Sequence, residues 1–159
     1  PRGVVGSISH CDGGCVAAVA RQQDVASIGI DLEDVEPLPE SLFQIVCSNA
    51  ELEDFRHNTP FSTAIAAKLA FSAKEAYYKC YFPVTKRFLD FSDVVVQFGK
   101  RNSDGIGEAY ITQNNLSKPV LDQSLLVCRW TLIDHMFFNA VTLLPPMNFG
   151  EAERAPHGI

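Results

Sequence analysis

Two acidic residues, Asp31 and Glu33, stand two positions apart in a segment that reads as a β-strand. Ile28, Ile30 and Leu32 alternate with them, so the apolar side chains take one face of the strand and both carboxylates take the other. Carboxylate oxygens are the donors that Mg²⁺ prefers, with water and substrate phosphates completing its coordination. The pair therefore predicts a divalent-cation site at the end of a core strand, and a solvated strand edge is the alternative.

A second candidate group consists of Lys74, Glu75 and Lys79. Glu75 and Lys79 are four residues apart, so a helix would carry them on one face, with Phe71 one turn before Glu75. An ordinary surface ion pair has this spacing and contributes only about 0.3–0.5 kcal/mol. The chemical interpretation makes Glu75 a third metal carboxylate or a base, and it makes Lys79 a clamp for a phosphate oxygen.

Ser9 and His10 stand together at the end of the first strand-like segment. A serine hydroxyl and a histidine ring can both donate hydrogen bonds to a phosphate oxygen. A hydrogen-bonded structural histidine is the plainer alternative. A nucleophilic pair of His10 with the adjacent Cys11 is not expected, because neighbours on an extended chain point to opposite sides.

The elements that must position these residues begin with short strands. Residues 4–9 and 15–20 flank a turn at 12–14, and residues 28–33 follow a polar connection. Two hairpin-linked strands followed by a third predict a small antiparallel meander.

The longest predicted helix carries Glu75 and Lys79. Thr59-Pro60 is a good helix start, because a capping hydroxyl precedes proline at the first helical position, and Pro83 is expected to end the helix. A short helix to about residue 46 and a second one opened by the capping box at 48–51 are expected before it. Apolar residues recur at helical spacing along the long helix: Ile65, Leu69, Ala73, Tyr77 and Cys80.

The period of the pattern returns to two after the long helix. This predicts four further strands, at residues 88–98, 106–112, 124–133 and 137–144, with a turn at Asp134-His135 between the last two. Residues 150–159 read as a loose tail.

Composition excludes several classes of protein. The chain has 159 residues, 47% hydrophobic and 20% charged, which suits one globular domain. A net charge of −6 without a lysine and arginine cluster argues against nucleic-acid binding. No apolar run is long enough for a membrane span. Five unevenly spaced cysteines without a CxxC pair suggest reduced thiols in a cytoplasmic protein rather than disulfides or a zinc site.

Three segments together resemble the signature motifs of the 4′-phosphopantetheinyl transferase superfamily. The family motifs read G-x-[IS]-S-H, G-[IV]-D-x-E and [FW]-[ST]-x-K-E-[AS]-x-x-K, and they occur here in that order. The match is closest to the larger pseudo-dimeric class and, within it, to the enterobactin-synthesis type. The segments are residues 6–11 (GSISHC), 29–33 (GIDLE) and 71–79 (FSAKEAYYK).

The resemblance implies an α+β fold of two similar halves, each with a small antiparallel sheet and a long packed helix. It places the end of the N-terminal half-domain at residues 1–27, the C-terminal half-domain with the metal site at 28–149, and a tail at 150–159. The rest of the N-terminal half, which in the family supplies basic residues for the coenzyme A phosphates, is then expected to precede this chain. The abrupt start at Pro1 agrees with a chain that begins inside a longer protein.

The resemblance also implies an activity, in which the phosphopantetheine of coenzyme A moves to a serine of an apo acyl, peptidyl or aryl carrier protein and adenosine 3′,5′-bisphosphate is released. Asp31, Glu33 and Glu75 would hold Mg²⁺, with Glu33 binding directly or through water, and Glu75 would accept the serine proton. Lys79 would hold a phosphate oxygen with Lys74 nearby in support, and Ser9 and His10 would contact the 3′-phosphate.

Two alternatives stay open on the sequence. One is a truncated or degenerate binding module of the same fold that does not catalyse transfer. The other is a different metal-dependent phosphate enzyme that uses the same three acids. The aromatic end of the long helix is either part of the core or the surface on which the carrier protein docks; its residues are Tyr77, Tyr78, Tyr81 and Phe82.

Overall fold

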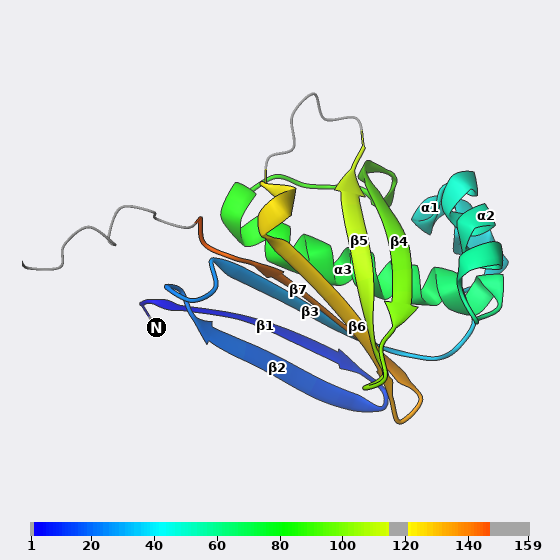
Figure 1. Cartoon of the computed structure of the whole chain (residues 1–159), viewed down its shortest axis with the longest axis horizontal. Coiled ribbons are helices and arrows are strands. Elements are labelled where there is room, and N and C mark those ends of the chain that lie inside the picture. The colour runs from blue at the N-terminus through cyan, green and yellow to red at the C-terminus, as the bar shows by residue number, and fades with distance from the viewer. Residues whose placement is uncertain (1, 115–120, 147–159) are drawn as a thin grey trace, which may run out of the picture.

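The computed structural model describes residues 2–114 and 121–146. In this part of the chain three strands come first, the main helices follow, and four further strands come last (Figure 1). The strands are β1 (Val4–Cys11), β2 (Gly14–Arg21), β3 (Ser27–Asp34), β4 (Val94–Arg101), β5 (Ile106–Gln113), β6 (Leu126–Ile133) and β7 (Met136–Leu143). The helices are η1 (Glu40–Leu42), α1 (Phe43–Val46), α2 (Asn49–Asn58), α3 (Thr63–Thr85), η2 (Phe91–Asp93) and η3 (Gln123–Leu125).

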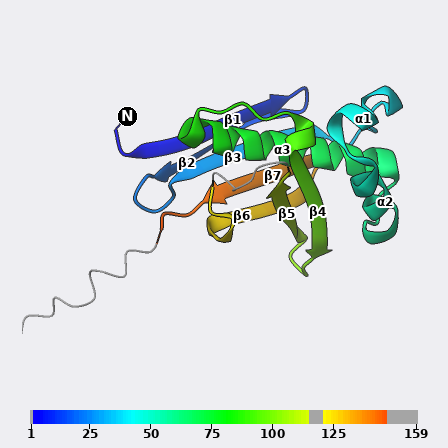
Figure 2. The ribbon, with the colours of Figure 1, turned by 90° about the horizontal axis from the view of Figure 1, so that it is seen from above.

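Five strands form one antiparallel sheet in the order β3-β7-β6-β5-β4, and β1 and β2 form a separate two-stranded sheet. The long helix α3 lies across the larger sheet, with α1 and α2 beside its first turns (Figures 1 and 2). The α+β class with antiparallel sheets and a long packed helix is thereby confirmed, while the pseudo-dimer and the boundary at residue 27 stay predictions.

The predicted meander is wrong, because β3 does not pair with β2. The hairpin β1–β2 instead lies alongside β3, which pairs with β7 on its other edge (Figure 2). Two serine side chains take the place of a strand ladder: Ser7 Oγ accepts from the backbone N–H of Ile30 at 3.0 Å and Ser9 Oγ from that of Leu32 at 3.2 Å. The first strand of the chain is therefore fixed to the edge of β3 by hydroxyl groups.

Helix α3 packs on the face of β3 that carries Gly29, Asp31 and Glu33. A β-carbon at Gly29 would overlap the carbonyl oxygen of Ala76 and the amide nitrogen of Cys80, so only glycine allows this approach. Small residues on the helix serve the same contact, since Ala73 and Ala76 are buried. Both faces of β3 are therefore covered, since α3 packs on the acidic face and Ile30 and Leu32 of the other face are also buried.

Both predicted ends of α3 are wrong. The helix starts at Thr63 with Ser62 as its N-cap, because Thr59 instead closes α2 with a hydroxyl bond to the carbonyl oxygen of Phe55. At the other end Pro83 lies inside the last turn, and the helix ends at Thr85 with Lys86 as its C-cap, whose φ of 56° is left-handed. A proline near a helix end removes one backbone bond, and the remaining turn is closed by the bond from Lys86 N–H to the carbonyl of Phe82.

The other local predictions hold with shifted limits. The capping box at Ser48 is present, and Glu51 is its acid. Strand β4 begins at Val94, because residues 91–93 form a 3-10 turn where strand was expected. Asp134 and His135 both have left-handed φ angles, as the two-residue hairpin turn between β6 and β7 requires. The predicted tail at 150–159 lies outside the described residues.

Among the described residues, no helix combines the length and apolar character that crossing a membrane requires.

Candidate functional site

An open pocket of about 350 Å³ lies where β1, β3 and α3 meet. It brings together six of the seven side chains that the sequence singled out, from segments up to 70 residues apart. The lining residues are Ile8, Ser9, His10, Asp31, Glu33, Phe71, Glu75 and Lys79.

Asp31 is the most buried acid of this pocket, with 4% of the residue exposed. Its Oδ1 accepts hydrogen bonds from Ser9 Oγ at 2.9 Å and from Lys79 Nζ at 2.7 Å. Its Oδ2 is buried and has no hydrogen-bond partner among the described residues. A buried polar atom without a partner is costly. The Oδ2 atom of Asp31 is therefore free to coordinate a cation or to accept a hydrogen bond from a ligand.

Ser9 connects the hairpin to the acidic site. Its hydroxyl donates to Asp31 and accepts from Leu32 N–H and, at 3.2 Å, from Lys79 Nζ. A hydroxyl has one donor and two acceptor positions, so these three bonds use its full capacity. His10, by contrast, is exposed at the edge of the pocket.

Glu75 is the half-buried acid that α3 contributes. Burial raises the pKa of Glu75 above its usual value, the negative charges of Asp31 and Glu33 raise it further, and Lys79 partly opposes them. Three carboxylates therefore interact in one pocket. The alternative of an ordinary ion pair between Glu75 and Lys79 is wrong, because Lys79 bonds to Asp31 across the helix–strand contact.

Lys68 is a member of this site that sequence reasoning missed. Its Nζ lies 2.6 Å from Glu33 Oε2 and 3.2 Å from Asp34 Oδ1, close to the ring of Phe71. Burial disfavours its charge, yet the two carboxylates outweigh that effect and raise the pKa of Lys68. The sequence could have indicated Lys68, because it stands seven residues before Glu75 and a helix therefore carries Lys68 and Glu75 on one face.

No three histidine, cysteine or acidic side chains in residues 2–114 and 121–146 stand close enough to form a metal-ligand set as they lie. Asp31 is paired with Lys79 and Glu33 with Lys68 instead. The chemistry of the pocket still fits a hard cation, because the free Oδ2 of Asp31 and the crowded carboxylate of Glu75 are oxygen donors that a divalent ion would stabilise.

Lys74 is the predicted site residue that the structure does not bring to this pocket. It is buried, and its ammonium donates to the carbonyl oxygens of Val46 and Phe91 and pairs with Glu51. The expectation that Lys74 lies beside the phosphate-binding residues is thereby corrected. An amine with three donors has none left for a phosphate.

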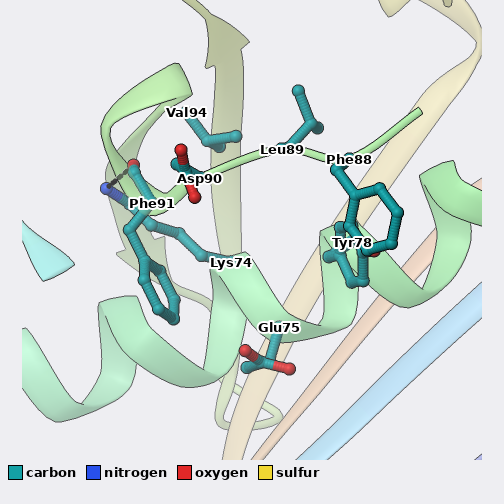
Figure 3. A pocket seen from close by; sticks show the side chains of 8 residues that line it. All are labelled: Lys74, Glu75, Tyr78, Phe88, Leu89, Asp90, Phe91 and Val94. Carbon is teal, nitrogen blue, oxygen red and sulfur yellow. Dashed lines mark hydrogen bonds between the residues drawn. The ribbon is translucent and has the colours of Figure 1, made fainter.

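Glu75 also lines a second cavity, of about 290 Å³ (Figure 3). Apart from Glu75, Lys74 and Asp90 its lining is apolar, and it includes Tyr78 and Phe88. Of the aromatic residues at the helix end, Tyr77 and Tyr81 are core residues with 1% exposure. Tyr78, Phe82 and the largely exposed Phe88 form an aromatic cluster, with ring centroids 5.3–6.3 Å apart.

Comparison with known proteins identifies the family. A family model described as the 4′-phosphopantetheinyl transferase superfamily matches residues 27–123, more than half of the chain. The chain belongs to this superfamily. The matched segment contains Asp31, Glu33, Glu75 and Lys79, so the acidic pocket lies largely within the part that defines the superfamily.

Curated members of the superfamily are similar along much of the chain. The 4′-phosphopantetheinyl transferase PptT of Mycobacterium tuberculosis is 34% identical over 148 residues, which is 90% of this chain and 63% of PptT. Npt of Nocardia iowensis is 44% identical over 98 residues, which is 62% of this chain and 43% of Npt. Svp of Streptomyces mobaraensis is 41% identical over 101 residues, which is 58% of this chain and 38% of Svp. The chain thus matches less than two thirds of the length of each of these relatives.

Proposed function

We propose that the protein containing this chain transfers the 4′-phosphopantetheine group of coenzyme A to a serine of an apo carrier protein, with Mg²⁺, and releases adenosine 3′,5′-bisphosphate. The observation that carries the proposal is the convergence of Asp31, Glu33, Glu75 and Lys79 on one pocket, where one oxygen of Asp31 has no partner. Membership of the superfamily and the names of the three relatives support it.

The site residues fit the two bonds that must change. The serine oxygen forms a bond to the phosphorus next to pantetheine, and the bond from that phosphorus to the bridging oxygen of the pyrophosphate breaks. Glu75 is the base that takes the serine proton, directly or through water, since its carboxylate lines both the acidic pocket and the apolar cavity. Asp31 and Glu75 would hold Mg²⁺, with Glu33 binding directly or through water, and the ion would supply charge neutralisation for the pyrophosphate.

The remaining polar residues would hold the coenzyme in place. Lys79 would give its remaining donor to a phosphate oxygen, because Asp31 and Ser9 use only two of its three N–H donors and its side chain is partly exposed. His10, exposed at the edge of the pocket, contacts the 3′-phosphate. Ser9 supports both lysine and aspartate rather than the phosphate, since its hydroxyl is already fully bonded. The apolar cavity beside Glu75 has a lining that suits the pantetheine arm.

The deciding experiment is incubation of the full-length protein with coenzyme A, Mg²⁺ and an apo carrier protein, followed by the intact mass of the carrier. A mass gain of one phosphopantetheine is expected, with no gain when EDTA replaces Mg²⁺. Asp31→Asn and Glu75→Gln should each lower the rate at least about 100-fold, the range that loss of a charged catalytic group gives. Glu53→Gln, on an exposed pair of α2, is the control.

A second candidate is a non-catalytic binding module of the same fold, which the pairing of Asp31 with Lys79 and of Glu33 with Lys68 favours, because these ion pairs occupy carboxylates that would hold a metal. A full-length protein that leaves the carrier mass unchanged, beside an active control enzyme, would favour this module. Retention of normal turnover by Asp31→Asn would contradict the metal assignment. From the motif resemblance alone we infer that the carrier protein serves siderophore synthesis, such as that of enterobactin, or other secondary metabolism, and that the reaction takes place in the cytoplasm. A comparison of kcat/KM for a panel of carrier proteins tests which pathway is served.

A further inference from the structure

A buried ionic network lies where α1, α2, η2 and β4 meet α3. Glu51 and Lys74 are its charged members, and their side chains are each 2% exposed. Glu51 Oε1 lies 2.9 Å from Lys74 Nζ and also accepts from the backbone N–H of Val96 at 2.9 Å. Glu51 Oε2 accepts from the N–H and hydroxyl of Ser48 at 2.8 and 2.9 Å and from Lys74 Nζ at 3.2 Å.

The ammonium of Lys74 joins three further parts of the main chain. It donates to the carbonyl oxygen of Val46 at 2.7 Å, at the end of α1, and to that of Phe91 at 3.1 Å, in η2. Glu51 adds the start of α2 and the strand β4. One acid and one amine thus fix α1, α2, η2 and β4 to the middle of α3.

This network bears on the acidic pocket through two neighbours. Glu75 directly follows Lys74 in α3, and the two side chains leave the helix in different directions (Figure 3). Phe91, held by its carbonyl, lines the apolar cavity together with Leu89 and Asp90, and Glu75 lines both cavities. The bonds of Lys74 therefore fix how α3 is rotated about its axis at Glu75. They also fix the distance between Glu75 and residues 88–91.

Stability alone does not require such a pair. Removing two charges from water is costly, and a buried ion pair is often no more stable than well-packed apolar residues of the same volume. The charged pair provides directional hydrogen bonds, which apolar packing lacks. The ammonium and the carboxylate orient several backbone N–H and C=O groups at once.

We propose that Glu51 is a positioning residue for the transfer reaction: it holds Lys74 and, through Lys74, the main chain at Phe91, so that Glu75 and the apolar cavity share one geometry. The proposal rests on the proposed function, since it concerns the orientation of the base of that reaction. Glu51 is not one of the residues that line the acidic pocket or the apolar cavity.

The test is Glu51→Gln in the full-length protein, which keeps the size of the side chain and removes its charge. We expect kcat to fall at least about tenfold, with KM for coenzyme A changed less than about threefold, at a temperature where both proteins are fully folded. Hydrogen–deuterium exchange should accelerate at 86–93 and stay unchanged in β6 and β7. Glu53→Gln, two residues away on the exposed side of α2, should change neither quantity.

A second variant separates positioning from stability. Glu51→Leu combined with Lys74→Met replaces the charged pair by apolar side chains. We expect this double variant to have a melting temperature close to that of the wild type, while its kcat stays as low as that of Glu51→Gln. If kcat recovers together with the melting temperature, or if folded Glu51→Gln turns over like the wild type, the positioning role is wrong. If the wild-type protein itself does not modify the carrier, the proposed function fails instead, and exchange at 86–93 still reports whether Glu51 orders that segment.

Discussion

Asp31 and Glu75 are two acids with different surroundings in one pocket. Asp31 is buried but receives two hydrogen bonds on one oxygen, from Ser9 and Lys79. Glu75 is half-buried beside two other acids, and its pKa is raised by burial first and then by the charges of Asp31 and Glu33. The two acids therefore differ in their surroundings: hydrogen bonds hold one oxygen of Asp31, whereas burial and neighbouring negative charge disfavour the ionised form of Glu75.

Glu75 should destabilise the fold at neutral pH when metal is removed. The pKa of Glu75 is higher in the folded protein than in the unfolded protein. The contribution of Glu75 to the free energy of unfolding is therefore most favourable at a pH below the unfolded-state pKa. This contribution is lost as the pH rises through the two pKa values, and the loss is complete above the folded-state pKa. In EDTA at pH 7, Glu75→Gln should raise the melting temperature by about 2 °C, a small gain because the group is partly exposed. The gain should vanish near about pH 3.5, where the carboxyl is protonated in both states.

Glu53→Gln is the matched control for this measurement by differential scanning calorimetry. The pKa of Glu53 is lowered by hydrogen bonds from His57 and Arg56, so loss of its charge should slightly lower the melting temperature at pH 7. A Glu75→Gln protein that is less stable than the wild type at pH 7 in EDTA would contradict the electrostatic description of the pocket.

At the scale of elements, the site depends on the contact between α3 and β3. Asp31 belongs to the strand and Glu75 and Lys79 to the helix, so any displacement of α3 separates them. Gly29 sets the spacing, because its missing β-carbon leaves room for the backbone of α3. Ser27 adds a hydroxyl bond of 2.6 Å to the carbonyl of Cys80, and Asn139 of β7 donates to Ser72 Oγ at 2.9 Å.

Gly29→Ala should therefore push the helix away from the strand. The new β-carbon meets backbone atoms of Ala76 and Cys80, which cannot rotate aside, so we expect a loss of about 3 kcal/mol or more in urea unfolding. Any protein that folds should have lost most of its transfer activity, because Asp31 and Glu75 no longer face one space.

Gly14→Ala provides a control for the same chemical change. A β-carbon there would meet the side chain of Leu32 at 3.6 Å, an ordinary contact, so stability should change by less than about 1 kcal/mol. Equal stability of Gly29→Ala and the wild type would show that α3 does not approach β3 as closely as described.

At the scale of the whole molecule, two sheets meet at β3 and the site forms on their junction. The hairpin β1–β2 contributes Ser9 and His10, and it is tied to β3 by the hydroxyls of Ser7 and Ser9. Two apolar side chains of the hairpin are exposed, Ile8 at 63% and Val19 at 73%. The larger sheet and α3 form the core, which includes three of the five cysteines.

The cysteines should report this division by their reactivity. All five are free thiols, and burial raises the pKa to about 12 for Cys47, about 11 for Cys80 and about 12 for Cys128. The thiolate is the reactive form, so these three should not react in the native protein. Cys15 is exposed and Cys11 partly so.

Titration with a thiol reagent at pH 8 should accordingly label Cys11 and Cys15 of this chain in the folded protein and all five in urea, as peptide mass mapping can verify. Rapid native labelling of Cys80, which lies between β3 and α3, would mean that the helix–strand contact opens readily.

The sequence alone determined the local chemistry of this protein. The alternation at 28–33 and the helical spacing at 71–79 placed Asp31 with Glu33 and Glu75 with Lys79, since strand and helix periods are set by the backbone. The order of the three motifs identified the superfamily. The capping box at Ser48 and the turn at Asp134-His135 were likewise predictable, because both depend on neighbours in the chain.

Only the tertiary structure decided which groups meet across the chain. The pairings of Lys79 with Asp31, of Lys68 with Glu33 and of Lys74 with Glu51 join residues 23–48 positions apart, and no local period encodes them. The same holds for the partner of β3, since β7 rather than β2 lies beside it. Long-range packing selects among many pairings that the local pattern allows equally, and here it turned Lys74 from a presumed phosphate ligand into part of the frame behind Glu75.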